Sequence, residues 1–154
     1  MTVGLGKKLP AFSLPRSDGS PWKSADSKEG RLVLFFYPKA MTPGCTLEGQ
    51  DFRDLHAAFK RAKTTVIGIS KDSCARQAKF REKEKFPFEL LSDEDEKVCR
   101  LFDVIREKSL YGRKFMGIER STFLFDGNGK LAREWRKVRV KGHAAEVLEA
   151  AKSS

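Results

Sequence analysis

Continuous apolar runs and a helical apolar period follow one another in the first half of the chain. Residues 31–37 (RLVLFFY) and Thr64–Ser70 (TTVIGIS) are apolar runs of the kind that form strands buried on both faces. Between them, residues 45–62 predict an amphipathic helix, whose apolar positions are Phe52, Leu55, Phe59 and Ala62 and whose polar positions are Glu48, Asp51, Arg53 and Lys60. Strand, helix and strand in this order predict a βαβ unit with parallel strands and a right-handed crossover.

The remaining pattern predicts shorter elements around that unit. Before it, an Asp18-Gly19 turn indicates a β-hairpin. After it, Asp72 or Ser73 is placed to cap a helix over 74–85. The chain then continues with a strand over 88–93 and a short helix over 93–105, whose inward positions are Val98, Leu101, Phe102 and Ile105. A hairpin of 117–126 and 131–138 follows around Gly127-Asn128-Gly129, and a helix over 143–152 comes last.

This order of elements predicts one α/β domain over residues 1–154, with a mixed central sheet flanked by helices. The βαβ unit supplies parallel strands, while the late hairpin supplies antiparallel ones. Internal repeats, linkers and low-complexity segments are absent from the sequence. The arrangement is that of a thioredoxin-like fold.

The composition narrows the expected partners and compartment. The formal net charge is +10, but the cations run from Lys7 to Lys152 among acids, and no RNA-recognition, zinc-finger or helix-turn-helix signature occurs. Solvated surface charge is therefore expected rather than a nucleic-acid partner. The sequence has neither an apolar run of the roughly 18–20 residues that span a bilayer nor the apolar core of a signal peptide. We therefore expect a cytoplasmic protein with no membrane partner.

The three cysteines, Cys45, Cys74 and Cys99, fit neither a disulfide framework nor a metal site. Their number is odd, no CxxC motif occurs, and no cysteine pairs with a histidine at metal-ligand spacing. Reduced thiols are the simpler interpretation. No heme or metal cofactor is expected.

Cys45 stands at a strand–loop–helix junction, where α/β proteins place reacting groups. It lies in the first turn of the predicted helix, where unpaired backbone N–H groups and the helix dipole favour an anion such as a thiolate. Gly44 allows close backbone approach, Pro43 stiffens the turn, and the Thr42 hydroxyl can donate a hydrogen bond. A packing cysteine is the alternative, but the preceding KAMTPG contains turn residues rather than core residues. The residues therefore favour an activated nucleophile.

Residues that are missing narrow the chemistry further. A cysteine hydrolase needs a histidine base, but His56 lies three turns along the same predicted helix and His143 begins the last one. Both histidines are expected to be exposed. A dithiol oxidoreductase would need a CxxC motif. A lone activated thiolate suits attack on the O–O bond of a peroxide, which produces a sulfenic acid.

The segment FYPKAMTPGCT resembles the active-site segment of peroxiredoxins, whose Pro-x-x-x-Thr-x-x-Cys pattern it matches at Pro38, Thr42 and Cys45. The flanking FFYPK, TPGCTLE and VIGIS and the distant MGIERSTFLFD are similar to the bacterioferritin comigratory protein subfamily, also called peroxiredoxin Q. The similarity covers nearly the whole chain. It implies a thioredoxin-like fold and a thiol-dependent peroxidase that reduces hydrogen peroxide and organic hydroperoxides.

The resemblance also implies a role for each matching residue. Cys45 would be the peroxidatic cysteine, Thr42 would hydrogen-bond to the peroxide oxygen, and Pro38 would shield the thiolate from solvent. Arg120, in GIERSTF, matches the arginine of the family, whose permanent charge would stabilise the thiolate and the transition state. From the residue alone, a surface arginine paired with Glu119 would be the simpler expectation.

The sequence departs from the subfamily where a resolving cysteine would stand. Gln50 occupies the position five residues after Cys45, and Arg81 occupies the later position. Cys74 lies two helical turns, about 10 Å, before Arg81, and a disulfide needs Cα atoms within about 7 Å. We therefore expect a one-cysteine mechanism with an external thiol, such as thioredoxin, glutaredoxin or a small thiol. A Cys45–Cys74 disulfide formed after local unfolding is the alternative, and Cys99 is expected to be a packing residue.

Functions of two other classes stay open from the residues themselves. A nucleic-acid-binding module would account for the positive charge but not for Cys45, and its affinity for DNA would fall steeply with salt. A thiol–disulfide exchange protein of the same fold would reduce disulfides without consuming peroxide. The subfamily resemblance suggests a monomer.

Overall fold

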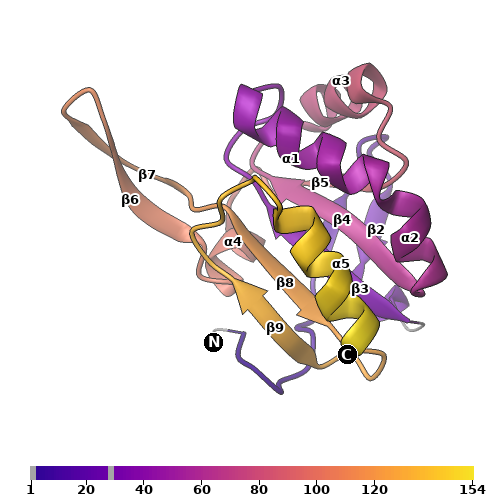
Figure 1. Cartoon of the computed structure of the whole chain (residues 1–154). Helices are drawn as coiled ribbons and strands as arrows, with labels where there is room; N and C mark the ends of the chain where they lie inside the picture. The colour runs from indigo at the N-terminus through magenta and orange to yellow at the C-terminus, as the bar shows by residue number, and fades with distance from the viewer. Residues whose placement is uncertain (1–2, 28–29) are drawn as a thin grey trace.

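The computed structural model describes residues 3–27 and 30–154. Its centre is a five-stranded sheet in the order β5-β4-β3-β8-β9 (Figure 1). The strands are β3 Arg31–Phe36, β4 Thr64–Ser70, β5 Glu89–Ser92, β8 Ser121–Phe125 and β9 Leu131–Trp135. β3, β4 and β5 are parallel, whereas β8 runs antiparallel to both β3 and β9. The expected mixed sheet and its parallel βαβ unit are therefore confirmed.

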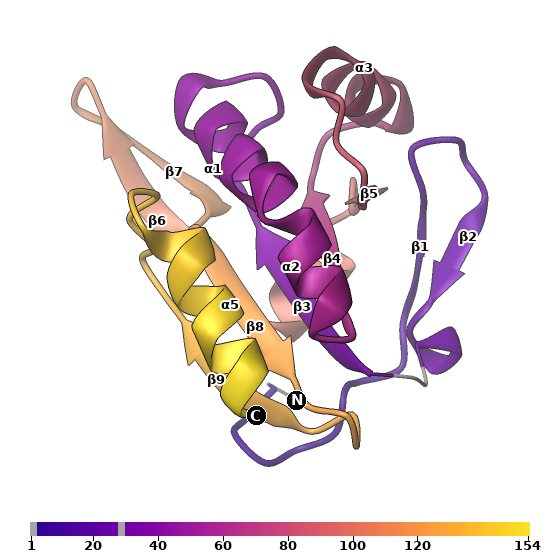
Figure 2. The same ribbon diagram turned by 45° about the vertical axis from the view of Figure 1, so that its right-hand side comes forward.

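Helices cover both faces of this sheet. The helices are α1 Pro43–Asp54, α2 His56–Arg61, α3 Cys74–Glu84, α4 Lys97–Leu101 and α5 His143–Ser153. α1, α2, α3 and α5 contribute buried side chains to one hydrophobic cluster, and α4 contributes to a second cluster. Figure 2 shows α1, α2 and α5 lying along one face of the sheet.

β3 shows why the sheet needs cover on both sides. Leu32, Leu34 and Phe36 pack in the cluster that contains α4, whereas Val33 and Phe35 pack in the cluster that contains α1. This division follows from the alternation of side chains along a strand. All five residues are at most 2% exposed, as a continuous apolar run predicts.

The helix predicted over residues 45–62 is two helices. α1 begins at Pro43 and ends at Asp54, and α2 begins at His56. The backbone turns at Leu55, where φ is −98° and ψ is 4°. No proline or glycine marks this break in the sequence, and the helical spacing continues across it because Phe52 and Phe59 are both buried.

A third hairpin, not predicted from the sequence, consists of β6 Ile105–Leu110 and β7 Arg113–Ile118. Ile105 therefore opens a strand, and the helix predicted over 93–105 is limited to α4. The hairpin turns at Tyr111-Gly112, with φ of 52° and 76°, rather than at an Asn-Gly pair. Most of its side chains are exposed, so no apolar period marks the strands. Figure 1 shows the hairpin projecting from the body of the molecule.

The hairpins predicted around the Asp18-Gly19 and Gly127-Asn128-Gly129 turns are confirmed. The first pairs β1 Ser13–Pro15 with β2 Pro21–Lys23, before a short 3-10 helix over Ser24–Asp26. The second pairs β8 with β9. Within residues 3–27 and 30–154, no helix combines the length and apolarity that crossing a bilayer would require.

Candidate active site

Cys45 lies in the first turn of α1 and is only 2% exposed. Thr42 is the N-cap residue with extended backbone, and Pro43 follows at a position where its missing N–H costs nothing. The N–H groups of Gly44 and Cys45 belong to the helix end whose donors have no intrahelical acceptor. This end of the helix favours negative charge on the sulfur atom Sγ of Cys45.

Arg120 reaches Cys45 from the short connection between β7 and β8. Its Nη2 atom lies 3.5 Å from Sγ, and its Nη1 atom lies 2.6 Å from Oε1 of Glu48. The Arg120 side chain is 16% exposed and pairs with Glu48, so the expectation of a surface arginine paired with Glu119 is wrong. Burial acts to lower the pKa of Arg120, but the charges of Glu48 and Cys45 outweigh it and raise that pKa. The guanidinium therefore stays charged beside the thiol.

Glu48 completes this cluster, and its buried position differs from the one that the helical periodicity predicts. The sequence pattern assigns Glu48 to the polar face of α1, yet it is 1% exposed and lies one turn from Cys45. Within residues 3–27 and 30–154 its Oε2 atom has no hydrogen-bond partner. Burial raises the pKa of Glu48 to about 7, and the charge of Arg120 opposes that rise. The i, i+3 spacing in CTLE is the sequence signal that could have identified it.

The first turn of α1 leaves room for the arginine, and the loop before it has a constrained backbone. A Cβ atom at Gly44 would lie 3.2 Å from Nη2 of Arg120, so a larger residue would press on the guanidinium. Met41 has a φ of 66°, in the left-handed region that non-glycine residues seldom adopt. Such a conformation persists where neighbouring contacts fix it.

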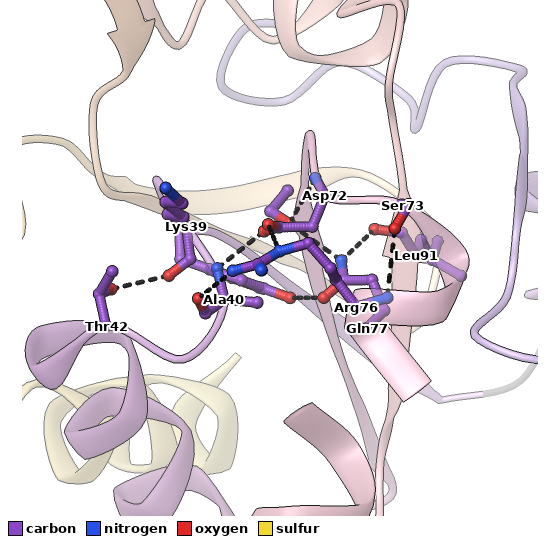
Figure 3. A network of polar contacts seen from close by, with 10 residues as sticks. Lys39, Ala40, Thr42, Asp72, Ser73, Arg76, Gln77 and Leu91 are labelled. Atoms are coloured by element: carbon purple, nitrogen blue, oxygen red, sulfur yellow. Dashed lines mark hydrogen bonds and ion pairs between the residues drawn. The ribbon is translucent and has the colours of Figure 1, made fainter. Parts of the chain in front are cut away.

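The neighbouring Ala40 is held by contacts from the β4–α3 connection and the first turn of α3 (Figure 3). Oδ2 of Asp72 accepts hydrogen bonds from Ala40 N–H over 2.7 Å and from Ser70 Oγ over 2.6 Å. Arg76 pairs with Oδ1 of Asp72 at 3.0 Å and donates to the Ala40 carbonyl at 3.1 Å. Ala40 is therefore fixed through both of its backbone polar groups. The sequence suggests only a capping role for Asp72, whereas the residue that caps α3 is Ser73.

Thr42 and Pro38 lie in the same loop and are half-buried. The Thr42 hydroxyl donates to the Lys39 carbonyl over 2.7 Å (Figure 3). A hydroxyl can rotate to another partner, and it keeps its acceptor lone pairs. The structure thus brings Pro38, Thr42 and Cys45 into one loop–helix segment, with Arg120 beside the sulfur.

The other two thiols lie in different surroundings. Cys74 is half-buried at the start of α3, in a pocket that Leu14, Ser92 and Lys97 also line. Cys99 is fully buried, its backbone N–H donates to Asp93 over 2.7 Å, and burial together with Asp93 raises the pKa of its thiol. Cys99 is therefore a packing residue, as expected. All three cysteines are free thiols.

His143 is buried rather than exposed. It is 6% exposed, its ring nitrogen Nε2 lies 2.7 Å from the Thr122 hydroxyl, and burial lowers its pKa to about 4. His56 is half-buried. Within the described parts of the chain, the side chain that bonds Sγ of Cys45 is Arg120, so the pairing of a thiol with a histidine base is absent there. Nor do residues 3–27 and 30–154 contain a cluster of His, Cys, Asp or Glu that could hold a metal ion.

The chain matches the AhpC/TSA family over residues 5–134. Peroxiredoxin Bcp of Bacillus subtilis is 48% identical over 152 residues, which cover 99% of this chain and 97% of that relative. Peroxiredoxin Bcp of Escherichia coli is 42% identical over 143 residues, which cover 93% of this chain and 92% of that relative.

Solved structures agree with these relatives. A peroxiredoxin Q of Xylella fastidiosa has a TM-score of 0.93 at 39% identity, covering 99% of this chain and 98% of that one. The bacterioferritin comigratory protein of Xanthomonas campestris, described for its alkyl peroxide reduction activity, has a TM-score of 0.87 at 45% identity, covering 92% and 90%. These structures confirm the thioredoxin-like fold. The chain therefore belongs to the AhpC/TSA family and is a thiol-dependent peroxidase of its Bcp, or peroxiredoxin Q, group.

Proposed function

We propose that this peroxidase reduces hydroperoxides through a sulfenic acid at Cys45. The thiolate attacks the hydroxyl oxygen of the peroxide, an S–O bond forms, and the O–O bond breaks. The sulfur is oxidised to Cys45–SOH, and the other oxygen takes up a proton and leaves as water or as an alcohol. The observation that carries the proposal is the Arg120 guanidinium 3.5 Å from a thiol at a helix N-terminus.

The neighbours of Cys45 receive complementary roles in this proposal. Arg120 stabilises the thiolate and the negative charge that develops on the peroxide oxygens. The Thr42 hydroxyl rotates from the Lys39 carbonyl to donate to the peroxide. Pro38 limits access of water to the sulfur. The place of Pro38, Thr42 and Cys45 in one loop–helix segment, with Arg120 3.5 Å from Sγ, supports the assignment.

An external thiol returns Cys45–SOH to the thiol in this proposal. Gln50 and Arg81 occupy the positions of the resolving cysteines found in the subfamily, and Cys99 lies in the core. Cys74 lines a pocket with residues of β1 and of the β5–α4 connection, whereas Cys45 packs among residues of α1, α2, α3 and α5. Thioredoxin, glutaredoxin or a small thiol is the proposed reductant. A Cys45–Cys74 disulfide is the alternative and needs the first turn of α3 to open.

We further propose one domain over residues 1–154 that works as a monomer in the cytoplasm, where a reducing environment keeps three free thiols reduced. Its substrates are hydrogen peroxide and organic hydroperoxides. The alkyl peroxide reduction described for the Xanthomonas campestris protein supports the organic substrates. The proposal needs no nucleic acid, membrane, metal or other cofactor.

The test is the intact mass of the protein after an equimolar amount of hydrogen peroxide in the presence of a sulfenic-acid trap. Wild type, Cys45→Ser and Cys74→Ser are compared. We expect one trapped adduct on wild type and on Cys74→Ser, none on Cys45→Ser, and loss of peroxide turnover only in Cys45→Ser. Serine is close in size to cysteine, so the fold is retained.

Other outcomes lead to different conclusions. Peroxide turnover that persists in Cys45→Ser would exclude the proposed function. A disulfide mass in wild type that is absent from Cys74→Ser would make Cys74 the resolving residue. Reduction of a protein disulfide without any consumption of peroxide would favour the thiol–disulfide exchange protein.

A further inference from the structure

The β6–β7 hairpin carries exposed apolar side chains that the core does not use. Within the described residues, the two strands pair only with each other. Four large apolar residues of the hairpin are exposed: Tyr111 at 96% at the tip, Leu110 at 57% and Phe115 at 46% on one face of the ribbon, and Met116 at 54% on the opposite face. Grouped exposed apolar side chains mark interaction surfaces in folded proteins, and tyrosine is enriched there.

The base of this hairpin adjoins the active site. β7 ends at Ile118, two residues before Arg120. Lys108 of β6 is half-buried, and burial and the charge of Arg120 lower its pKa, while the charges of Cys45 and Glu119 oppose this. Lys108 therefore lies within electrostatic range of both Cys45 and Arg120. A molecule bound along the hairpin would be held next to the reactive sulfur.

The loop between β9 and α5 borders the same arginine. The backbone N–H of Val138 donates to the Arg120 carbonyl over 3.0 Å. Both views place this loop beside the base of the hairpin (Figures 1 and 2). Its residues 136–141, RKVRVK, include four cations and no acid. Lys137, Arg139 and Lys141 line a pocket that extends to the start of α5, where Glu146 also lines it and pairs with Arg133.

Five cations in these two segments have no ion-pair partner within the described residues. Among the residues that the structure describes, Lys108, Arg113, Lys137, Arg139 and Lys141 form no ion pair. Charges that are not paired internally produce a field that attracts an oppositely charged partner. An apolar centre with a polar rim is the usual composition of a protein–protein interface, and arginine is enriched there.

We propose that the hairpin and the β9–α5 loop form a docking surface for the protein that reduces Cys45, which presents acidic and apolar residues around its own reactive cysteine. The inference rests on the proposed function, because it requires an external reductant. The thiolate of the reductant attacks Sγ of Cys45–SOH, an S–S bond forms, and the oxygen takes up a proton and leaves as water. A second thiolate of the reductant then attacks the reductant's own sulfur in this mixed disulfide. Cys45 leaves as a thiolate, and the reductant is oxidised to a disulfide.

A protein fits this surface better than other occupants do. A small thiol or hydroperoxide would reach Cys45 without using Tyr111 at the hairpin tip. A second copy of the chain would bring the same excess of cations and would be repelled. A nucleic acid would match the cations, but it would leave the apolar side chains of the tip without a complementary surface.

The experiment separates the oxidation of Cys45 from its reduction. The double variant Arg113→Glu/Lys137→Glu reverses two cations of the docking surface. Tyr111→Asn removes the exposed ring and introduces a residue that tolerates the positive φ of this position. The matched control, Lys60→Glu/Lys79→Glu, makes the same change in net charge on exposed positions of α2 and α3.

A thioredoxin of acidic isoelectric point and dithiothreitol are used as alternative reductants. With thioredoxin, we expect kcat/KM to fall about tenfold in the double variant and about fivefold in Tyr111→Asn. Both variants should match wild type in kcat/KM with dithiothreitol and in the amount of trapped Cys45–SOH. The control should match wild type in these two quantities and in kcat/KM with thioredoxin. Raising the ionic strength from about 0.05 M to about 0.5 M should lower the thioredoxin kcat/KM of wild type more than that of the double variant.

Unchanged thioredoxin kinetics in both variants would overturn the docking surface, and so would equal losses with thioredoxin and with dithiothreitol. DNA binding that is lost in the double variant while thioredoxin kinetics stay unchanged would assign the cations to nucleic acid and would also overturn it. Failure to trap Cys45–SOH in wild type would contradict the proposed function instead, so the two failures are distinguishable.

Discussion

Glu48 sets how much of the Arg120 charge is available to Cys45. Its carboxyl group is buried and bonds the same guanidinium that lies beside Sγ. When Glu48 is ionised it neutralises part of that charge, and when it is protonated the guanidinium faces the thiol alone. A buried carboxyl group with a pKa near 7 therefore places this balance within the physiological pH range.

The raised pKa of Glu48 makes folding stability depend on pH. Between its ordinary pKa of 4.5 and about 7, the folded state keeps a proton that the unfolded state releases. The free energy of unfolding therefore falls as pH rises through this window, by about 1–3 kcal/mol from this residue, and is level above it. Glu48→Gln has no such titration. Urea unfolding at pH 5 and pH 8 should show a smaller loss of stability in Glu48→Gln than in wild type.

The matched control for this comparison is Glu82→Gln, at an exposed position of α3. It should keep the pH dependence of wild type. Parallel profiles for wild type and Glu48→Gln would show that Glu48 titrates normally in the folded protein.

At the scale of elements, the chemistry depends on how the start of α1 is held against its neighbours. The loop from β3 to α1 is not self-supporting, because Met41 has a positive φ and Ala40 is buried. Asp72, from the β4–α3 connection, and Arg76, from the first turn of α3, bond both polar groups of Ala40. The position of Cys45 thus depends on a connection that contributes no residue to the reacting atoms.

Asp72→Ala should reveal this dependence. It leaves the buried Ala40 N–H without an acceptor and Arg76 without its ion-pair partner, so we expect a loss of stability of about 1–3 kcal/mol. Because the loop positions the sulfur, the rate constant for oxidation of Cys45 by hydrogen peroxide should fall on the order of tenfold, as measured by stopped-flow. Asp54→Ala, which removes an exposed acid from the far end of α1, should change neither quantity. Oxidation at the wild-type rate in folded Asp72→Ala would show that the loop keeps its geometry without the anchor.

At the scale of the whole molecule, the sheet and the β6–β7 hairpin differ in how they are supported. β3 and β8 are buried on both faces, whereas the outer part of the hairpin lies in solvent. The active site lies where the two meet. The buried core thus holds α1 with Cys45 and the β7–β8 connection with Arg120, while the projecting hairpin presents the exposed side chains of the proposed docking surface.

Hydrogen exchange followed by mass spectrometry should report this difference. Amide hydrogens of β6 and β7 near the Tyr111-Gly112 turn should exchange by local opening, long before those of β3 and β8, which exchange only on larger unfolding. Equal protection in both regions would mean that a contact outside the hairpin holds it.

Much of the fold follows directly from the sequence. The continuous apolar runs identify β3 and β4 because strands buried on both faces need apolar side chains at every position. The sequence pattern does not predict the β6–β7 hairpin or the break at Leu55. The first has exposed strands and an unusual Tyr-Gly turn, and the second interrupts a helix whose apolar spacing continues across it.

The sequence by itself singled out Cys45 as the proposed reacting residue, because Thr42, Pro43, Gly44 and Cys45 create a helix start whose local geometry favours a thiolate. Only the tertiary structure decided what surrounds that thiol. Arg120 is 75 residues from Cys45 in sequence. Glu48 is buried, although the helical periodicity assigns it to the polar face of α1. The unpaired cations also become one surface only when β6–β7 and the β9–α5 loop are folded together. Local backbone preferences depend on neighbouring residues, whereas burial and charge pairing depend on contacts between segments that are distant along the chain.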